Sequence, residues 1–192
     1  MKLIIVRHGE TIENKKGILQ GQSHGKLNKL GKKQSKKLAE RLANEKIDAI
    51  YCSDLRRCKE TLEPLLKIKK QNVFYTPLLR EIKRGVFEGK PNSEYKRWLK
   101  SHPNQTAKGM ETKEKIDKRI LKFINQELTS HKNNVVLIVT HGTTKKVILN
   151  RLLGNKNKLI EKTSPNTGIT IVNILENKKA VVEELHYTRH LE

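Results

Sequence analysis

The chain has 192 residues, 35% of them hydrophobic, which is enough for one domain with a buried core and too little for two domains of ordinary size. Its 41 basic and 20 acidic residues give a formal net charge of +21, but the dispersed lysines and few aromatic residues favour a solvated basic surface over nucleic-acid binding. No apolar run approaches the roughly 18 residues of a membrane span and the apolar start is too short for a signal peptide, so we expect a cytoplasmic protein.

The first third of the chain alternates predicted strands and helices. Residues 2–7 (KLIIVR) predict a buried strand that ends at a histidine and a glycine, and residues 47–52 (IDAIYC) predict a second one. Between them, residues 30–44 place apolar side chains at helical spacing on a very basic segment. Another helix is expected through residues 57–66, capped by the serine or the aspartate that follows the second strand.

The middle of the chain is broken by glycine and proline. Residues 73–79 predict a short extended piece, and residues 84–110 predict a helical insertion over the active site, with a short helix at residues 92–100. Residues 111–130 then place apolar side chains on one stripe, which predicts a long helix that packs on one face only.

The last third returns to strands. Residues 135–140 (VVLIVT) form the most apolar predicted strand, a helix is expected at residues 143–153, and residues 169–175 and 180–185 predict an antiparallel hairpin. The pattern indicates an α/β fold: a three-layer sandwich whose mostly parallel sheet carries helices on both faces. We expect a single domain over residues 1–190, and the terminal two residues are read as a possible tag remnant.

Two of the strongest predicted strands end in a His-Gly pair, at His8 and at His141. The carboxyl ends of parallel strands meet at one edge of a sheet, where ligands of open α/β sheets bind. Arg7 precedes the first histidine and Arg57 begins a helix, so two histidines and two guanidiniums are expected around one pocket. Guanidiniums bind phosphate, and neighbouring positive charge keeps an imidazole neutral and nucleophilic. The residues alone therefore allow a histidine nucleophile that acts on phosphate.

A metal site is the alternative for the same residues. Its candidate ligands are His8, His141, Glu10 and Glu81. Two permanently charged guanidiniums would repel a cation from this crevice, so an anion is favoured and no metal or other cofactor is expected. Cys52 and Cys58 lack metal-ligand spacing and are expected to be free thiols.

Residues 7–11 read RHGET and resemble the signature of the histidine phosphatase superfamily, in its phosphoglycerate-mutase-like branch. Residues 19–31 are similar to the substrate loop of that family, and residues 53–61 are similar to its SDLxRAxxT motif. Residues 79–89 resemble LREIxxGxWEG, and residues 140–142 match the distal histidine motif. Residues 109–112 also resemble the GGES that opens a long helix, so six motifs occur in the order of the family.

The resemblance implies a role for each matched residue. His8 attacks phosphorus, and Glu81 protonates the leaving oxygen and then activates water, with Glu88 and Glu10 as alternative acids. The phosphoryl oxygens are expected to be bound by Arg7, Arg57 (rather than Arg56) and His141, and the phosphate cradle to be completed by Asn14, Gln20, Gly21 and Gly142.

The chain departs from the family pattern near the substrate. His24 and Lys26 stand where the family loop has Asp and Pro, and Phe87 replaces a tryptophan near the proton donor. The mouth of the pocket could be lined by Lys26, Lys83, Arg84, Lys90 and Lys96, which would favour polyanionic substrates, or these could be ordinary surface cations.

The leading hypothesis is a phosphomonoesterase that acts on a small phosphorylated metabolite. A cofactor-dependent phosphoglycerate mutase is the alternative, although residues 81–85 lack the His and Tyr of the ERHYG-like segment of mutases. A nucleic-acid-binding module on the same fold is the remote alternative.

Overall fold

A six-stranded sheet forms the centre of the computed structural model, which describes residues 1–103, 105–154 and 163–192. Its strands are β1 (Lys2–Arg7), β2 (Ala49–Ser53), β3 (Val73–Thr76), β4 (Val135–Thr140), β5 (Ile169–Ile174) and β6 (Ala180–Tyr187). The order across the sheet is β3-β2-β4-β1-β5-β6. The pairs β3–β2, β2–β4 and β4–β1 are parallel, whereas β1–β5 and β5–β6 are antiparallel. The predicted mostly parallel sheet with an antiparallel closing hairpin is confirmed.

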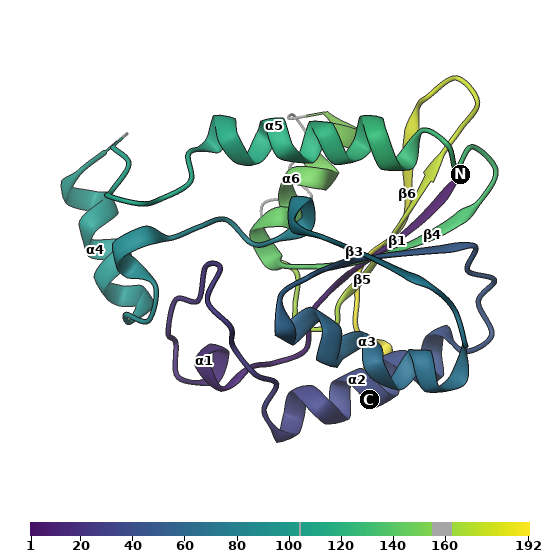
Figure 1. Ribbon diagram of the computed structural model, residues 1–192, viewed down its shortest axis with the longest axis horizontal. Coiled ribbons are helices and arrows are strands. Elements are labelled where there is room, and N and C mark those ends of the chain that lie inside the picture. The colour runs from purple at the N-terminus through teal and green to yellow at the C-terminus, as the bar shows by residue number, and fades with distance from the viewer. Residues whose placement is uncertain (104, 155–162) are drawn as a thin grey trace.

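Helices cover both faces of this sheet (Figure 1). The α-helices of the described ranges are α1 (Ile12–Lys15), α2 (Lys29–Leu42), α3 (Arg56–Ile68), α4 (Asn92–Ser101), α5 (Lys113–Phe123) and α6 (Gly142–Leu153). Figure 1 shows α5 and α6 on one side of the sheet, α2 and α3 on the other, and α4 beyond its end. The expected three-layer α/β arrangement is therefore present.

Alternate residues of the strands point into two separate hydrophobic clusters. In β1, Leu3 and Ile5 belong to the cluster beneath α5 and α6, whereas Ile4 and Val6 belong to the cluster over α2 and α3. All four side chains are fully buried. A strand whose two faces are both covered must be apolar on both, which explains the continuous apolar runs of β1 and β4.

The segment that was predicted as an insertion, residues 84–110, contains α4, and its two ends pair with each other. Arg84 bridges Met110, and the Val86 amide donates to the Lys108 carbonyl over 3.2 Å. Gly85 lies between them at φ 55°, where a Cβ atom would approach the Lys108 oxygen to 2.2 Å, so only glycine fits. Residue 104, within the predicted insertion, is outside the described part of the chain.

Several local expectations need correction. The predicted cap of α3 is wrong: Leu55 occupies the cap position without a side-chain hydrogen bond, and the Asp54 carboxylate instead binds Arg80 at 2.7 Å and 2.5 Å. The long helix predicted to residue 130 ends as an α-helix at Phe123 and continues as a π-helical turn through Leu128. The short helix α1 was not predicted.

The last two residues lie on α2, because Lys37 Nζ donates to the carbonyls of Leu191 and Glu192. The origin of these two residues stays a prediction.

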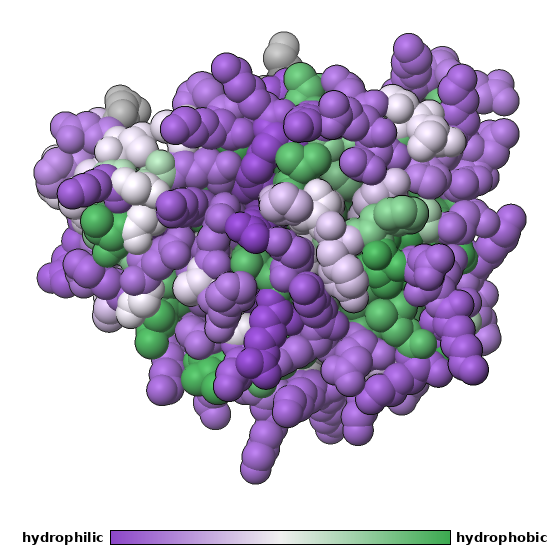
Figure 2. Space-filling model, viewed as in Figure 1, coloured by the Kyte–Doolittle hydropathy of each residue, from purple (hydrophilic) through white to green (hydrophobic). Residues whose placement is uncertain are grey.

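None of the helices in the described ranges combines the length and apolar character needed to cross a bilayer. Hydrophilic residues cover most of the face seen in Figure 2, with hydrophobic residues in small patches between them.

Candidate active site

The carboxyl ends of β1 and β4 bring the two predicted histidines together. Arg7 is in register with Thr140, and the His8 amide donates to the Thr140 carbonyl over 2.9 Å. The rings of His8 and His141 follow at the same edge, with their centroids 5.2 Å apart. A cavity of about 280 Å³ opens there. Of the predicted site residues, its wall contains Arg7, His8, Asn14, Gln20, Gly21, Arg57, Glu81 and Gly142.

His8 is held in one tautomer. Its Nδ1 lies 2.8 Å from the Gly9 carbonyl oxygen, which can only accept, so Nδ1 carries the proton and Nε2 keeps its lone pair. The Gly9 amide donates to Thr61 Oγ1 over 2.9 Å and so fixes the turn. Burial, then the charges of Arg57 and Arg7, lower the pKa of His8 well below its ordinary value of 6.5. The ring is therefore neutral at neutral pH.

Arg57 is buried behind this ring, with 1% of its surface exposed. Its guanidinium donates to the Gly21 carbonyl at 2.8 Å, the Ser23 carbonyl at 2.7 Å and His141 Nδ1 at 3.1 Å. The loop at residues 19–31 and His141 are thus both held by this one side chain. Three contacts leave two of the five guanidinium N–H groups for other acceptors.

His141 lies against Arg57 rather than in the cavity wall. Because His141 Nδ1 accepts from Arg57, its Nε2 carries the proton, which is donated to Ser53 Oγ over 2.8 Å. Burial, followed by the nearby Arg57 and His8, lowers the pKa of His141 well below 6.5. The geometry gives His141 a positioning contact with Arg57, and direct binding of the phosphoryl group by His141 stays a prediction.

Arg7 is clamped by a turn that the sequence did not mark as functional. Arg7 Nη1 donates to the Ser164 carbonyl over 2.7 Å, and Asn166 Nδ2 donates to the His8 carbonyl over 2.9 Å. The Thr167 amide donates to the Arg7 carbonyl over 3.0 Å, and Thr167 has φ 53°, a strained value for a β-branched residue. Arg7 Nε is buried and has no hydrogen-bond partner within the described ranges, so it is a free donor in the cavity wall that also contains His8.

Lys145 supports the same turn from inside the protein. It lies on α6, its side chain is fully buried, and its Nζ donates to Ser164 Oγ over 3.0 Å and to the Gly168 carbonyl over 2.8 Å. Burial, then the charge of Arg7, lowers the pKa of Lys145 well below 10.5. Nothing in the sequence separated this lysine from the many exposed ones.

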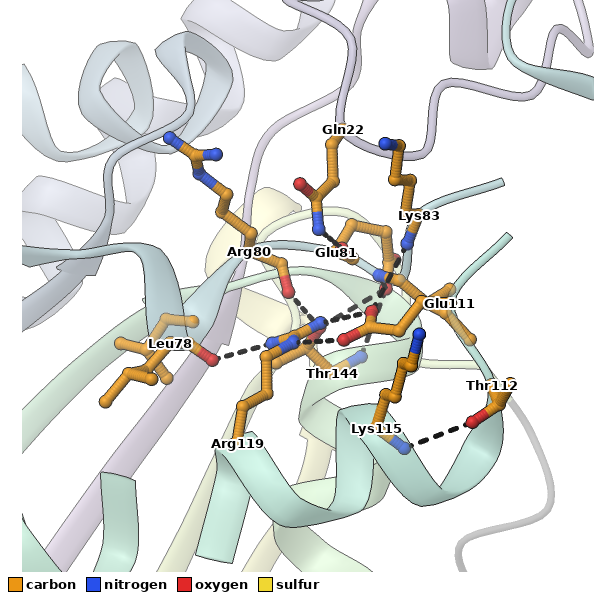
Figure 3. Close-up of polar contacts among 12 residues, drawn as sticks. Gln22, Leu78, Arg80, Glu81, Lys83, Glu111, Thr112, Lys115, Arg119 and Thr144 are labelled. Atoms are coloured by element: carbon orange, nitrogen blue, oxygen red, sulfur yellow. Dashed lines mark hydrogen bonds and ion pairs between the residues drawn. The ribbon is translucent and has the colours of Figure 1, made fainter. Parts of the chain in front are cut away.

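Glu81 lies at the amino-terminal end of α6 (Figure 3). Its Oε2 accepts from the Thr143 amide at 3.1 Å, and its Oε1 accepts from the Thr144 amide at 3.2 Å and from its own neighbour, the Ile82 amide, at 2.9 Å. A helix amino terminus is a favourable place for a carboxylate because its amides are free and its dipole is positive. Gln22 Nε2 donates to the Glu81 carbonyl over 3.0 Å.

The two alternative acids have other partners. Glu88 Oε1 accepts from the amides of Gln22 and Arg84 at 3.0 Å and 2.9 Å, and Glu10 Oε1 accepts from Asn28 Nδ2 at 2.5 Å. Among the three carboxylates, only Glu81 belongs to the described wall of the cavity.

A second carboxylate braces the segment that carries Glu81. Glu111 forms a two-point ion pair with Arg119, at 2.7 Å and 3.0 Å, and Arg119 Nη1 donates to the Leu78 carbonyl over 2.6 Å (Figure 3). Glu111 also exchanges backbone and side-chain hydrogen bonds with Lys83. These contacts join the start of α5 to Leu78 and Lys83, which lie on either side of Glu81 in the chain. Sequence reasoning did not predict them.

The remaining predicted residues also lie in the wall of the cavity. Asn14 completes a capping box with Thr11 at α1, and Gln20 is nearly buried with an Oε1 that has no partner in the described ranges. Gly142 begins α6, where a Cβ atom would lie 3.6 Å from Arg7 Nε. A bare backbone at this position keeps space beside the free donor of Arg7.

The described residues contain no group of three or more His, Cys, Asp or Glu side chains placed to hold a metal ion. Both cysteines are buried free thiols, as expected. The groups that converge on the cavity are guanidiniums, a neutral imidazole and one carboxylate, Glu81, whose charge is met by the amides at the start of α6; the guanidiniums suit an anion.

Comparison with known families decides the class. The model of the histidine phosphatase superfamily (branch 1) matches residues 3–185. The chain belongs to this superfamily, and it is a phosphatase.

This histidine phosphatase has relatives along its whole length. It is 33% identical over 203 residues to a probable phosphatase of Schizosaccharomyces pombe, with 100% of this chain and 96% of the relative covered. It is 30% identical over 206 residues to a metal-independent phosphoserine phosphatase of Arabidopsis thaliana, covering 99% of this chain and 83% of the relative. The solved structure of Bacillus stearothermophilus YhfR superposes with a TM-score of 0.88 at 25% identity, covering 100% and 99% of the two chains.

Proposed function

We propose that this phosphatase hydrolyses phosphate monoesters of small metabolites through a phosphohistidine on Nε2 of His8. The observation that carries the proposal is the state of His8: its proton is held at Nδ1 by Gly9, and burial of the ring, together with the charges of Arg57 and Arg7, lowers its pKa and keeps it neutral. Only a neutral imidazole has a lone pair with which to attack phosphorus. The same guanidiniums offer donors to the phosphoryl oxygens, where charge gathers in the transition state.

The reaction has two displacements at phosphorus. In the first, His8 Nε2 attacks, the bond to the ester oxygen breaks, and Glu81 gives its proton to the departing alcohol. In the second, Glu81 takes a proton from water, the oxygen attacks phosphorus, and the electron pair of the P–N bond returns to Nε2. The products are the alcohol and inorganic phosphate. The free Nε–H of Arg7 and the unused N–H groups of Arg57 stabilise the phosphoryl oxygens in both steps.

A labelling experiment tests this pathway. The purified protein is mixed with a radiolabelled phosphate ester in EDTA and quenched rapidly, and the acid-labile, base-stable label is mapped by peptide sequencing. We expect the label on His8, and no label or turnover in His8→Ala. His190→Ala serves as the matched control, because His190 lies in the carboxyl-terminal turn and outside the cavity wall. Turnover that persists in His8→Ala, or that is lost in EDTA, would contradict the proposal.

Product analysis separates hydrolysis from mutase activity. With 3-phosphoglycerate as the substrate, we expect glycerate and inorganic phosphate. Conversion to 2-phosphoglycerate without release of phosphate would favour the alternative of a phosphoglycerate mutase.

A further inference from the structure

Arg84 is a third guanidinium in the cavity, and the proposed mechanism does not use it. It belongs to the same wall as His8 and Glu81. No carboxylate within the described ranges forms an ion pair with it. Its side chain contacts neutral groups instead: Nη1 donates to the Tyr95 hydroxyl over 2.8 Å, and Nη2 reaches Thr143 Oγ1 at 3.5 Å.

The position of Arg84 is fixed by the residues packed around it. Its guanidinium carbon lies 4.9 Å from the centre of the Tyr95 ring, and that ring packs at 5.3 Å on Phe87, which is buried. Its own amide donates to Glu88 Oε1 over 2.9 Å, and the following Gly85 can only be glycine. An arginine that is held on an aromatic face keeps its charge and loses little further freedom when it binds an anion.

Thr143 places Arg84 on the leaving-group side of the cavity. The Thr143 amide donates to Glu81 Oε2 at 3.1 Å, while its hydroxyl contacts Arg84. Thr143 therefore links the guanidinium of Arg84 to Glu81, the proposed donor of a proton to the ester oxygen. Arg7 and Arg57 lie instead around the nucleophile and the phosphoryl group.

We infer that Arg84, seated on Tyr95, binds a carboxylate carried by the leaving group of the substrate. This inference rests on the proposed function of the same cavity. The substrate class is then a phosphorylated hydroxy acid or hydroxy amino acid rather than a plain alkyl, sugar or nucleoside monophosphate. A planar carboxylate matches the fork of a guanidinium in a two-point hydrogen bond.

Two substrate pairs test the inference. Phosphoserine and phosphoethanolamine differ only in the carboxylate. In the second pair, glycerol 3-phosphate has a neutral hydroxymethyl group where 3-phosphoglycerate has its carboxylate. We expect the wild type to favour the carboxylate member in kcat/KM, and Arg84→Met to reduce this preference about 10- to 100-fold. Tyr95→Phe, which keeps the ring and removes the hydroxyl, should reduce it less. Lys83→Met removes an exposed neighbouring cation outside the wall and should leave the ratio as in the wild type.

The outcomes separate this inference from the proposed function. Equal losses on both members of a pair in Arg84→Met, or a wild type without preference, overturn the carboxylate subsite and leave the phosphohistidine intact. The wild type could instead prefer propane-1,3-diol bisphosphate over propyl phosphate by a larger factor than it prefers the carboxylate member of either pair. Arg84 would then bind a second phosphate rather than a carboxylate, which would also overturn the inference. Calorimetric binding of both serine-series ligands to His8→Ala, with and without Arg84→Met, gives the same comparison without turnover. Failure of the proposed function would appear instead as turnover that does not require His8.

Discussion

Replacement of Lys145 by methionine should change how the stability of the protein depends on pH. Lys145 is fully buried, and its pKa is lowered well below 10.5 by burial and then by Arg7. In the unfolded chain the same amine is protonated up to its ordinary pKa. The unfolded state thus binds one more proton than the native state between the two pKa values, so the stability of the wild type rises with pH in that window and levels off above 10.5.

The expected magnitude follows from linkage. While the native amine is neutral, the free energy of unfolding of the wild type should gain up to about 1.4 kcal/mol for each pH unit, relative to Lys145→Met. Methionine also removes the donor to Ser164 Oγ and the Gly168 carbonyl, a constant loss of about 1–3 kcal/mol for each acceptor that is left unsatisfied. The two effects are separable because only the first depends on pH.

Urea unfolding, followed by far-UV circular dichroism, measures both effects. The difference in unfolding free energy between the wild type and Lys145→Met is plotted from about pH 7.5 to about pH 9.5, within the range of lysine titration. Lys118→Met, a change on the exposed side of α5, gives the comparison for the loss of a surface charge. A difference that stays flat across this range would show that Lys145 is charged in the native protein and would refute the reasoning.

Three further substitutions probe the site and its support. Gly31→Ala would place a Cβ atom 2.0 Å from the Glu10 carbonyl oxygen, and we expect a loss of about 1–3 kcal/mol or more in urea unfolding; unchanged stability would show that the backbone yields there. Glu81→Gln should lower kcat/KM, which reports formation of the phosphohistidine, about 10²- to 10⁴-fold on alkyl phosphates and much less on p-nitrophenyl phosphate, whose leaving group needs no proton; equal losses of kcat/KM on both substrates would argue against a proton donor. Ser53→Ala removes the hydroxyl that accepts from His141 Nε2–H and leaves only the weak acceptor Cys58 Sγ at 3.4 Å, so it should cost about 1–3 kcal/mol of stability in the same unfolding assay, whereas Ser53→Thr, which keeps the hydroxyl, should recover most of it.

The sequence predicted the parts of the site that lie close together in the chain. Strand β4 was predicted with its bounds, residues 135–140, because an apolar run that is buried on both faces has one simple interpretation. The RHGET segment places Arg7 beside His8, so their proximity follows from the covalent chain. Arg57 could be chosen over Arg56 only through the resemblance, and the structure shows the former buried and the latter exposed.

Contacts between distant segments could not be predicted in the same way. The carbonyl of Ser164 that holds Arg7 is 157 residues away in the chain, and Lys145 reads as one of 41 basic residues. Its burial becomes visible only when α6 is packed on the sheet. The predicted cap of α3 failed for a related reason, because Asp54 has a stronger partner in Arg80, which is 26 residues away. The tendency of aspartate to cap a helix was outweighed there by its two charge-assisted hydrogen bonds with Arg80.

The net charge and the position of one cation make different contributions to substrate choice. A charge of +21 attracts every anionic ester, but this attraction is screened over a Debye length of about 8 Å at physiological salt. It can raise the rate of encounter, yet it cannot distinguish phosphoserine from phosphoethanolamine once either is in the cavity. Arg84 acts at hydrogen-bond distance and in a partly desolvated wall, where screening is weak. Added salt should therefore slow turnover of all esters through their encounter rate, whereas the preference for a carboxylate should depend on Arg84.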